Sequence, residues 1–290
     1  MEKTKYKYRL GHYKEVGKVV CPYCGKKEFV RYVEIATGKI IEGFGRCDRD
    51  TCPSRSISDG GVVYPDKPID TSKFKTVKKD EKPKVFYDPE IVKEYAEKRT
   101  ENALCRYLLQ KAADKERFEN VLKMYRIGSV NDGIIFWQID GSQNVRRGKV
   151  MFYDENGHRK KTAGGITSMW KILNRDKDNE PEMCCFGQHL VGLLPVAIVE
   201  SEKTALVASY AVPELTWIAT SSISNFNTNR LQFLNGFKKP VIVFPDYDGY
   251  DKWAEQTEFF KASTKLNISV DDTIKHYGSG KQDIADLFLS

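Results

Sequence analysis

Two short apolar runs in the last third of the chain each end in carboxylates. Val196–Val199 leads into Glu200, and Val241–Pro245 leads into Asp246 and Asp248. Apolar runs of this length are typical of strands covered on both faces, and open α/β sheets place ligands outside the carboxyl ends of such strands. Acids gathered there repel one another unless they share a cation, and oxygen ligands suit Mg²⁺. The pattern therefore predicts a magnesium site and phosphoryl chemistry.

A third acidic motif follows near the end of the sequence, in Gly278–Phe288, which contains Lys281, Asp283 and Asp286. The three motifs together resemble the Toprim domain of DnaG-type primases, topoisomerases and related enzymes. That domain has a strand ending in Glu, a later strand ending in Asp-x-Asp, and a further acidic motif near its end. The last motif is also similar to the Lys-Asp-x-x-Asp/Glu-Leu tail of plasmid and phage primases. One departure is Ser201, where many primases have Gly after the Glu.

The resemblance implies a nucleotidyltransferase site in which divalent metals position the reacting groups and neutralise the triphosphate charge. Glu200, Asp246 and Asp248 are its implied catalytic residues, with Glu200 a ligand or an acid/base group. The implied ligands of Mg²⁺ or Mn²⁺ are Asp246, Asp248, Asp283 and Asp286. We interpret Glu202 as an acid favoured by the N-terminal dipole of a helix. The competing interpretation of the whole set is strand-end capping in an inactive α/β domain.

Four cysteines near the N-terminus have the spacing of a metal site. Cys21-Pro-Tyr-Cys24-Gly is a zinc-knuckle turn, and Cys47 and Cys52 form a second pair with four intervening residues. The segment between them alternates like a hairpin with its turn at 36–38. This layout predicts a zinc ribbon with a structural Zn²⁺. A ribbon ahead of a Toprim core is the arrangement of primases, although many have one His among the ligands. Three further cysteines lack paired spacing and are expected to be buried thiols: Cys105, Cys184 and Cys185.

The net charge of +7 is unevenly distributed. Residues 1–84 hold 20 Lys/Arg against 12 Asp/Glu, whereas residues 85–290 hold 27 against 28. The asymmetry favours a nucleic-acid-binding segment joined to a near-neutral body, although a solvated basic surface would give the same balance. In the ribbon, Tyr32 and Phe44 either stack on bases or form its own small core. The expected nucleic-acid and nucleotide contacts are Arg31, Arg46, Arg146, Arg147, Lys149, Lys160, Lys161 and Lys281.

The remaining pattern predicts an α/β protein in four segments. These are a zinc ribbon over 1–60, a linker over 61–84, a basic mixed α/β subdomain over 85–190 and a Toprim domain over 191–290. Helices are expected within 88–124, and strands at 133–139 and 148–153 with Arg146 and Arg147 in the loop between them. From 195 onward, strands at 196–200, 216–220, 241–246 and about 273–277 alternate with helices near 202–210, 228–235 and 251–264, as in a parallel sheet.

The leading hypothesis is a DNA-dependent RNA primase that synthesises short primers on single-stranded DNA. Its expected partners are the template, nucleoside triphosphates and a replicative helicase, with no membrane. We expect a cytoplasmic protein, because no apolar run reaches the length of a membrane span and no signal peptide is evident. The short chain suggests a stand-alone enzyme of a mobile element. The rivals are a Toprim nuclease or topoisomerase-like strand cutter, and a non-catalytic zinc/Toprim DNA-binding protein of the recombination-mediator type.

Overall fold

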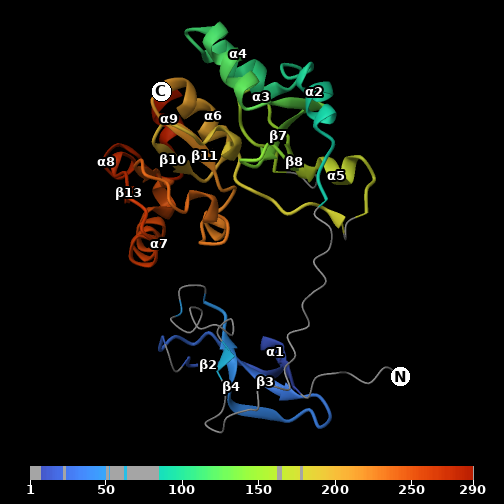
Figure 1. Ribbon diagram of the computed structural model, residues 1–290, viewed down its shortest axis with the longest axis vertical. Helices are drawn as coiled ribbons and strands as arrows, with labels where there is room; N and C mark the ends of the chain where they lie inside the picture. The colour runs from blue at the N-terminus through green and yellow to red at the C-terminus, as the bar shows by residue number, and fades with distance from the viewer. Residues whose placement is uncertain are drawn as a thin grey trace. The chain divides into compact units, whose positions relative to one another are not determined.

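A computed structural model describes residues 8–21, 24–49, 52, 62–63, 85–161, 165–176 and 179–289 (Figure 1). The chain divides into two compact units, Met1–Lys82 and Pro83–Ser290. Among the described residues, no helix combines the length and the apolar character that crossing a membrane requires.

The first unit is built on an antiparallel sheet in the order β1-β3-β4-β5, with β2 beside β3. Its elements are β1 (Tyr8–Leu10), α1 (Tyr13–Val16), β2 (Lys18–Val19), β3 (Phe29–Glu34), β4 (Ile40–Cys47) and β5 (Val62–Val63). The predicted hairpin is confirmed, because β3 and β4 pair in antiparallel register from Phe29 opposite Cys47 to Val33 opposite Ile40. Of the predicted linker, Val62–Val63 is described and pairs with β4, and the rest lies outside the described residues.

The second unit begins with helices and an antiparallel sheet in the order β6-β7-β8-β9. Three helices occupy the predicted helical region: α2 (Pro89–Ala96), α3 (Ala103–Lys111) and α4 (Lys115–Met124). Asp88 caps α2 and Pro89 is its first residue, as the sequence predicted. The strands are β6 (Gly128–Val130), β7 (Gly133–Ile139), β8 (Val145–Met151) and β9 (Ile166–Ser168), followed by α5 (Met169–Ile172).

The position predicted for Arg146 and Arg147 was wrong. Both residues lie within β8 rather than in the preceding loop, because β8 begins at Val145. The turn is shorter than expected: the Asp140 carboxylate accepts the backbone N–H groups of Ser142 and Asn144, which closes the chain tightly after β7.

A parallel sheet in the order β11-β10-β12-β13 completes the second unit. Its strands are β10 (Val196–Val199), β11 (Thr216–Ala219), β12 (Val241–Val243) and β13 (Ile268–Val270). The helices are α6 (Glu202–Ala211), α7 (Tyr250–Ser263), α8 (Thr273–Tyr277) and α9 (Ile284–Leu289). The region predicted as a helix near 228–235 contains only the short 3-10 helix η6 (Gln232–Leu234).

The predicted strand at 273–277 was also wrong, since these residues form α8. The fourth strand lies a few residues earlier, where Ile268–Val270 pairs with β12. Asp271 accepts the N–H of Thr273, and the backbone N–H of Lys275 bonds to the Asp272 carbonyl, so the chain turns into a helix directly after β13.

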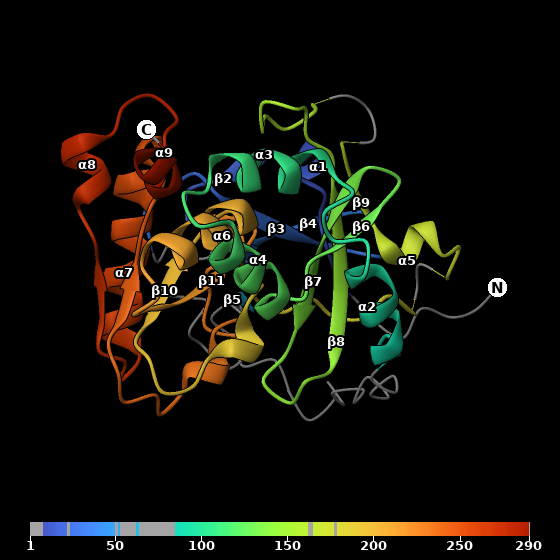
Figure 2. The ribbon, with the colours of Figure 1, turned by 90° about the horizontal axis from the view of Figure 1, so that it is seen from above.

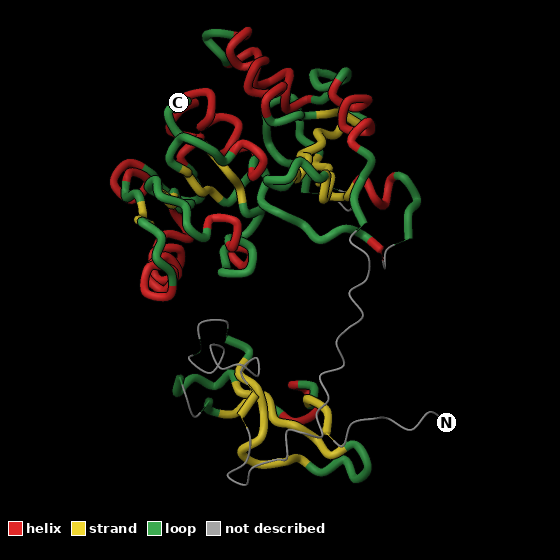
Figure 3. Tube along the Cα trace, in the orientation of Figure 1, coloured by secondary structure: helices red, strands yellow, loops and turns green. Residues whose placement is uncertain are grey.

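The two sheets of the second unit share one apolar core. Ile134 and Phe136 of β7 and Ala197 and Val199 of β10 belong to the same buried cluster, together with residues of α3, α4, α6 and α9. Figure 2 shows α7 and α8 on the far side of β10 from β7, and Figure 3 shows the same helices and strands coloured by type. The opposite face of the parallel sheet packs on Trp253 and Phe260 of α7. Both faces of β10 are therefore buried, as its unbroken apolar sequence requires.

Candidate functional site

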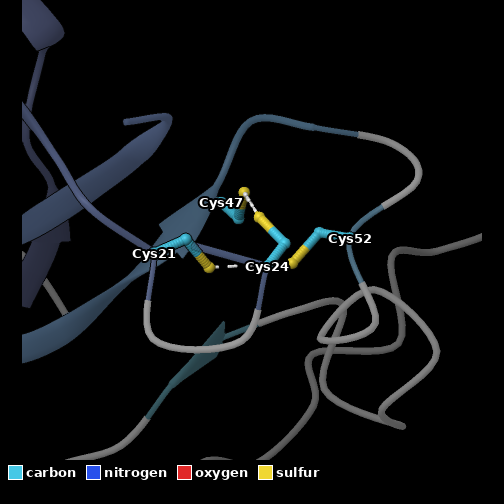
Figure 4. Close-up of side chains that lie close together, drawn as sticks. All are labelled: Cys21, Cys24, Cys47 and Cys52. Carbon is cyan, nitrogen blue, oxygen red and sulfur yellow. Dashed lines mark hydrogen bonds between the residues drawn. The ribbon is translucent and has the colours of Figure 1, made fainter. Parts of the chain in front are cut away.

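Four cysteine thiols in the first unit converge on one point (Figure 4). The sulfur atoms of Cys21, Cys24, Cys47 and Cys52 all lie within 4.8 Å of one another. Cys21 Sγ lies 3.7 Å from Cys52 Sγ, and Cys24 Sγ lies 3.8 Å from Cys47 Sγ. These distances are far longer than a disulfide bond. They match the edge of about 3.8 Å that a tetrahedron of sulfurs has around zinc at about 2.3 Å. The arrangement is that of a structural Zn²⁺ site.

Local backbone geometry places these thiols. Gly25 has φ +67°, and its N–H donates to the Cys21 carbonyl at 2.9 Å, which closes the first knuckle. Cys47 is the last residue of β4, so the hairpin carries it to the opposite side of the site. Burial raises the pKa of the Cys47 thiol. A thiol held neutral in this way would be a poor ligand alone, and a bound cation supplies the charge that favours its thiolate.

Most of the cationic and aromatic groups of the ribbon have partners within it. Arg31 donates to the Glu42 carboxylate and to the Val16 carbonyl. Tyr32 stacks on Phe44 with ring centroids 4.3 Å apart, which favours the small-core interpretation of this pair. The Nε atoms of Arg31 and Arg46 are both buried without a hydrogen-bond partner among the described residues. Arg46 differs in its terminal nitrogens, which make no hydrogen bond or ion pair with another described residue, whereas those of Arg31 do.

The acidic motifs of the second unit come together at the carboxyl edge of the parallel sheet. Glu200 follows β10, and Asp246 follows the chain out of β12. The backbone N–H of Tyr247 donates to the carbonyl of Gln282 at 2.9 Å, which places the second motif against the third. Asp248 lies in the 3-10 helix η7 (Tyr247–Gly249) and is exposed.

Asp246 experiences the negative charge of the other acids at this edge. Its pKa is raised to about 7, first by burial and then by the negative charges of Asp283, Glu200, Asp248 and Asp286. Its Oδ1 atom is buried without a hydrogen-bond partner among the described residues. A buried carboxylate oxygen with no donor and several acidic neighbours is what a cation would satisfy.

Asp283 and Asp286 also have a structural part, as the N-terminal cap of α9. Asp283 Oδ1 accepts the N–H groups of Ala285 and Asp286, while Asp286 Oδ2 accepts the N–H of Asp283 at 3.0 Å. This reciprocal bonding is a capping box. The other oxygen of Asp283 accepts the Thr204 hydroxyl at 2.6 Å. Burial raises the pKa of Asp283, against the opposing effect of the Thr204 hydrogen bond.

The acidic edge is more open than the cysteine site. In the part of the chain that the structure describes, only the four cysteines bring three or more ligand atoms within 4.8 Å of one another. The carboxylates around Asp246 therefore do not form a closed ligand cluster like that of the cysteines.

Sequence reasoning missed the role of Glu202. Its carboxylate is buried and receives both hydrogen bonds of Lys149 Nζ, at 2.8 and 3.0 Å, as well as one from the Ser221 hydroxyl. Lys149 is thus occupied by a carboxylate in this structure. A helix-start acid with a partly buried Lys partner 53 residues away has no local signal in the sequence.

Arg146 and Arg147 line a cavity of about 970 Å³ on the second unit. Arg147 forms a two-point ion pair with Glu180, and Arg146 lies 3.5 Å from the Asp140 carboxylate and over the Phe86 ring. Arg230, from the chain after β11, adds a third guanidinium, whose buried Nε atom has no hydrogen-bond partner among the described residues. Several amide side chains also line the cavity: Gln188, Asn227, Asn229 and Gln232.

The other predicted contact lysines are exposed. Lys160 lies 3.9 Å from the Asp132 carboxylate, and Lys161 is its neighbour in the sequence. Lys281 precedes Asp283 in the third acidic motif. The thiols predicted to be buried, Cys105, Cys184 and Cys185, are buried.

Two family descriptions match the sequence. Residues 6–53 match a zinc beta-ribbon finger family, which agrees with the four-cysteine site. Residues 102–247 match a family described as a domain of unknown function (DUF6371). A search of the curated proteins gave no match.

Among solved structures, the chain is similar to three primase fragments. The first is the primase fragment of the bacteriophage T7 primase-helicase protein, with 14% identity, a TM-score of 0.40, and coverage of 87% of this chain and 88% of that one. The second is the RNA polymerase domain of Mycobacterium tuberculosis primase DnaG, with 14% identity, a TM-score of 0.43, and coverage of 69% and 77%. The third is Aquifex aeolicus primase, in its zinc binding and RNA polymerase domains, with 11% identity, a TM-score of 0.40, and coverage of 90% and 75%.

The DUF6371 match covers half of the 290 residues and spans the antiparallel sheet, strands β10 to β12, and the acids Glu200 and Asp246. The chain is a member of the family described as domain of unknown function DUF6371.

Proposed function

We propose that this protein is a DNA-dependent RNA primase of the DnaG type, with residues 191–290 forming a Toprim domain. In this proposal it joins nucleoside triphosphates into short primers on single-stranded DNA. The observation that carries the proposal is the buried, unpartnered Oδ1 of Asp246, surrounded by Asp283, Glu200, Asp248 and Asp286 at the carboxyl edge of a parallel sheet. The order of the three motifs, which resembles Toprim, supports the same function.

Asp246 and Asp248 would hold the catalytic Mg²⁺ or Mn²⁺, with Asp283 and Asp286 as further ligands. When bound, the cation neutralises the charge of the triphosphate and positions it for in-line attack by a 3′-hydroxyl. Glu200 ends β10 beside this group, where it would be a ligand or accept the proton of the attacking hydroxyl. The Thr204 hydroxyl and the α9 amides fix the Asp283 carboxylate, so this acid is oriented before any substrate arrives.

The basic residues would hold template and nucleotide. The cavity beside Arg146 and Arg147 has a size suited to a nucleotide, and the amide side chains of its lining suit the edges of bases. The two guanidiniums would exchange their present carboxylates for phosphates on binding. Arg31, Arg46, Lys160, Lys161 and Lys281 are proposed as weaker contacts along the strand. A replicative helicase, and a role in a mobile element, belong to the same proposal.

One observation favours a second candidate, a non-catalytic zinc and Toprim DNA-binding protein. Asp283 and Asp286 already satisfy the amides at the start of α9, as they would in a domain where acids serve only as caps. In that case the chain would bind DNA without joining nucleotides, and cations would not be needed.

Primer synthesis separates the two candidates. The wild type is incubated with single-stranded DNA, labelled ribonucleotides and Mg²⁺ or Mn²⁺, beside Asp246→Asn and the matched control Asp251→Asn. Asp251 is an exposed acid of the first turn of α7 and is not among the charges that act on Asp246. Short products from the wild type and Asp251→Asn, but not from Asp246→Asn, establish the primase. DNA binding by all three without products supports the binding protein, and a cut template supports a nuclease.

A further inference from the structure

A buried ion pair connects the antiparallel sheet to the start of α6. Lys149 lies on β8, opposite Phe136 of β7, and its Nζ contacts both carboxylate oxygens of Glu202. The Glu202 side chain is 2% exposed and that of Lys149 is 17% exposed. Removing the lysine would leave a carboxylate uncompensated in a nearly dry site, so the two groups hold each other firmly.

Ser221 connects this ion pair to Glu200, the residue that follows β10. Its hydroxyl donates to the Glu202 carboxylate, and its backbone N–H donates to the carbonyl of Glu200 at 2.8 Å. Gln138 Nε2 of β7 lies 3.5 Å from the same hydroxyl. Ser221 has φ +67°, a conformation that non-glycine residues adopt only where their surroundings impose it. The hydrogen bonds at both ends of the residue supply that constraint.

The same turn of α6 reaches the third acidic motif. Thr204, two residues beyond Glu202, donates its hydroxyl to Asp283 Oδ2 at 2.6 Å. A shift of the start of α6 would therefore move the Glu200 carbonyl contact and the Asp283 contact together. Both acids lie next to Asp246, whose pKa they raise.

We propose that Lys149 is a positioning residue, which acts through Glu202 and Ser221 to hold Glu200 and Asp283 in place around Asp246. In this role Lys149 stays on Glu202 and does not contact the nucleotide, which departs from its sequence-based interpretation. The inference rests on the proposed function, because it assumes that the acids form a divalent cation site. The chain of contacts from Lys149 to Glu200 can nevertheless be measured without any cation.

The test uses the full chain and two readouts, with the variants Lys149→Met, Glu202→Gln, the double variant, Lys149→Arg and the control Lys93→Met. Lys93 pairs with Glu90 on the exposed face of α2. Lys93→Met therefore also removes a lysine and an ion pair, but at a position distant in the sequence from Glu200, Asp246 and Asp283. The first readout is backbone hydrogen exchange at 219–223 and 200–206 without added cation. The second is Mn²⁺ binding followed by electron paramagnetic resonance, with Asp246→Asn as the reference for a lost site.

We expect Lys149→Met to speed exchange of the Ser221 amide by at least about ten-fold, because its acceptor is no longer held. Mn²⁺ binding should weaken about 10–100-fold, the range typical of groups that orient metal ligands. The double variant should show no faster exchange and no weaker Mn²⁺ binding than the more strongly affected single variant, since both residues act through one contact. Lys149→Arg should restore part of both readouts, and Lys93→Met should match the wild type.

Unchanged exchange in Lys149→Met, or losses that simply add in the double variant, overturn the positioning role. A variant that exchanges and binds Mn²⁺ like the wild type but needs more nucleotide in primer synthesis would also overturn it, because Lys149 would then contact substrate. If Asp246→Asn leaves Mn²⁺ binding unchanged, the proposed metal site fails, and the exchange readout alone still decides the role of Lys149.

Discussion

Tyr247 and Gln282 are joined by a backbone hydrogen bond of 2.9 Å, from the N–H of the first to the carbonyl of the second. The bond ties the chain that leaves β12 to the chain that enters α9. Each partner is the sequence neighbour of an acid, Asp246 on one side and Asp283 on the other. The two carboxylates are therefore held together by the backbone in spite of their repulsion, which is the condition for a site that binds a cation when one arrives.

Replacing Asp246 by Asn should stabilise the protein when no divalent cation is added. Asn has a similar shape but no charge, so it removes the repulsion that raises the pKa of Asp246. We expect a gain of roughly 1–3 kcal/mol in the free energy of unfolding at pH 8. Urea unfolding of wild type, Asp246→Asn and Asp251→Asn measures it. Equal or lower stability of Asp246→Asn would show that its carboxylate is not strained by its neighbours.

Cation affinity should depend on pH in the way the raised pKa of Asp246 dictates. Below a pKa of about 7 the carboxyl is protonated, and a cation must displace that proton to bind. Mn²⁺ affinity of the wild type should fall by about ten-fold per pH unit below pH 7 and level off above it. Electron paramagnetic resonance titrations from pH 5.5 to 8.5 follow the change. An affinity that stays flat over this range would contradict the assignment of Asp246 as a ligand.

Cys21→Ser should release the zinc and unfold the sheet of the first unit. Cys21 Sγ lies 3.7 Å from Cys52 Sγ within the group of four sulfurs, and serine is a much weaker zinc ligand than a thiolate. Zinc content measured by atomic absorption should fall from one ion per chain to nearly none. Cys185→Ser is the matched control, since Cys185 is buried in the core of the second unit. Retention of zinc by Cys21→Ser would remove this cysteine from the ligand set.

The sequence predicted the positions of the acids well because strand ends are local features. The unbroken apolar run of β10 and the Asp-x-Asp after β12 needed only the rule that ligands gather at the carboxyl edge. The four cysteines were equally predictable, since spacing alone identifies a zinc ribbon.

The errors came from features that depend on distant partners or on weak periodicity. β13 is three residues long, and its identity as a strand comes from pairing with β12 rather than from its own sequence. Glu202 was interpreted from its place at a helix start, whereas its buried carboxylate pairs with Lys149 of β8, far away in the sequence. The pairing of Arg147 with Glu180 joins residues 33 positions apart, so a basic pattern in the sequence overstated the free positive charge.

His189 should make the protein sensitive to mild acid. Burial lowers its pKa to about 4, and its Nε2 atom lies 3.2 Å from the Met124 carbonyl while Nδ1 has no partner among the described residues. The unfolded chain takes up a proton near pH 6.5 and the folded chain only near 4, so stability is lost as pH falls between these values. When the pH falls from 7.5 to 4.5, the free energy of unfolding should decrease by about 1–2 kcal/mol less in His189→Gln than in the wild type. Urea unfolding at both values measures the difference, and parallel losses in the two proteins would contradict it.

Arg46 should contribute more to single-stranded DNA binding than Arg31, although both belong to the same ribbon. The terminal nitrogens of Arg31 are held by Glu42 and by the Val16 carbonyl, whereas the guanidinium of Arg46 makes no hydrogen bond or ion pair with another described residue. A phosphate contact releases counterions, so its loss lowers the salt dependence of binding.

Arg46→Ala should weaken binding and reduce the slope of log affinity against log salt by about one, while Lys93→Ala should change neither quantity. Arg31→Ala should change the slope less than Arg46→Ala does, since its guanidinium already pairs with the Glu42 carboxylate. Fluorescence anisotropy with a labelled oligonucleotide between 50 and 300 mM salt, about the range over which such slopes are read, measures all four proteins. A larger change of slope in Arg31→Ala than in Arg46→Ala would reverse the assignment, because the ion pair with Glu42 would then have to open whenever DNA binds.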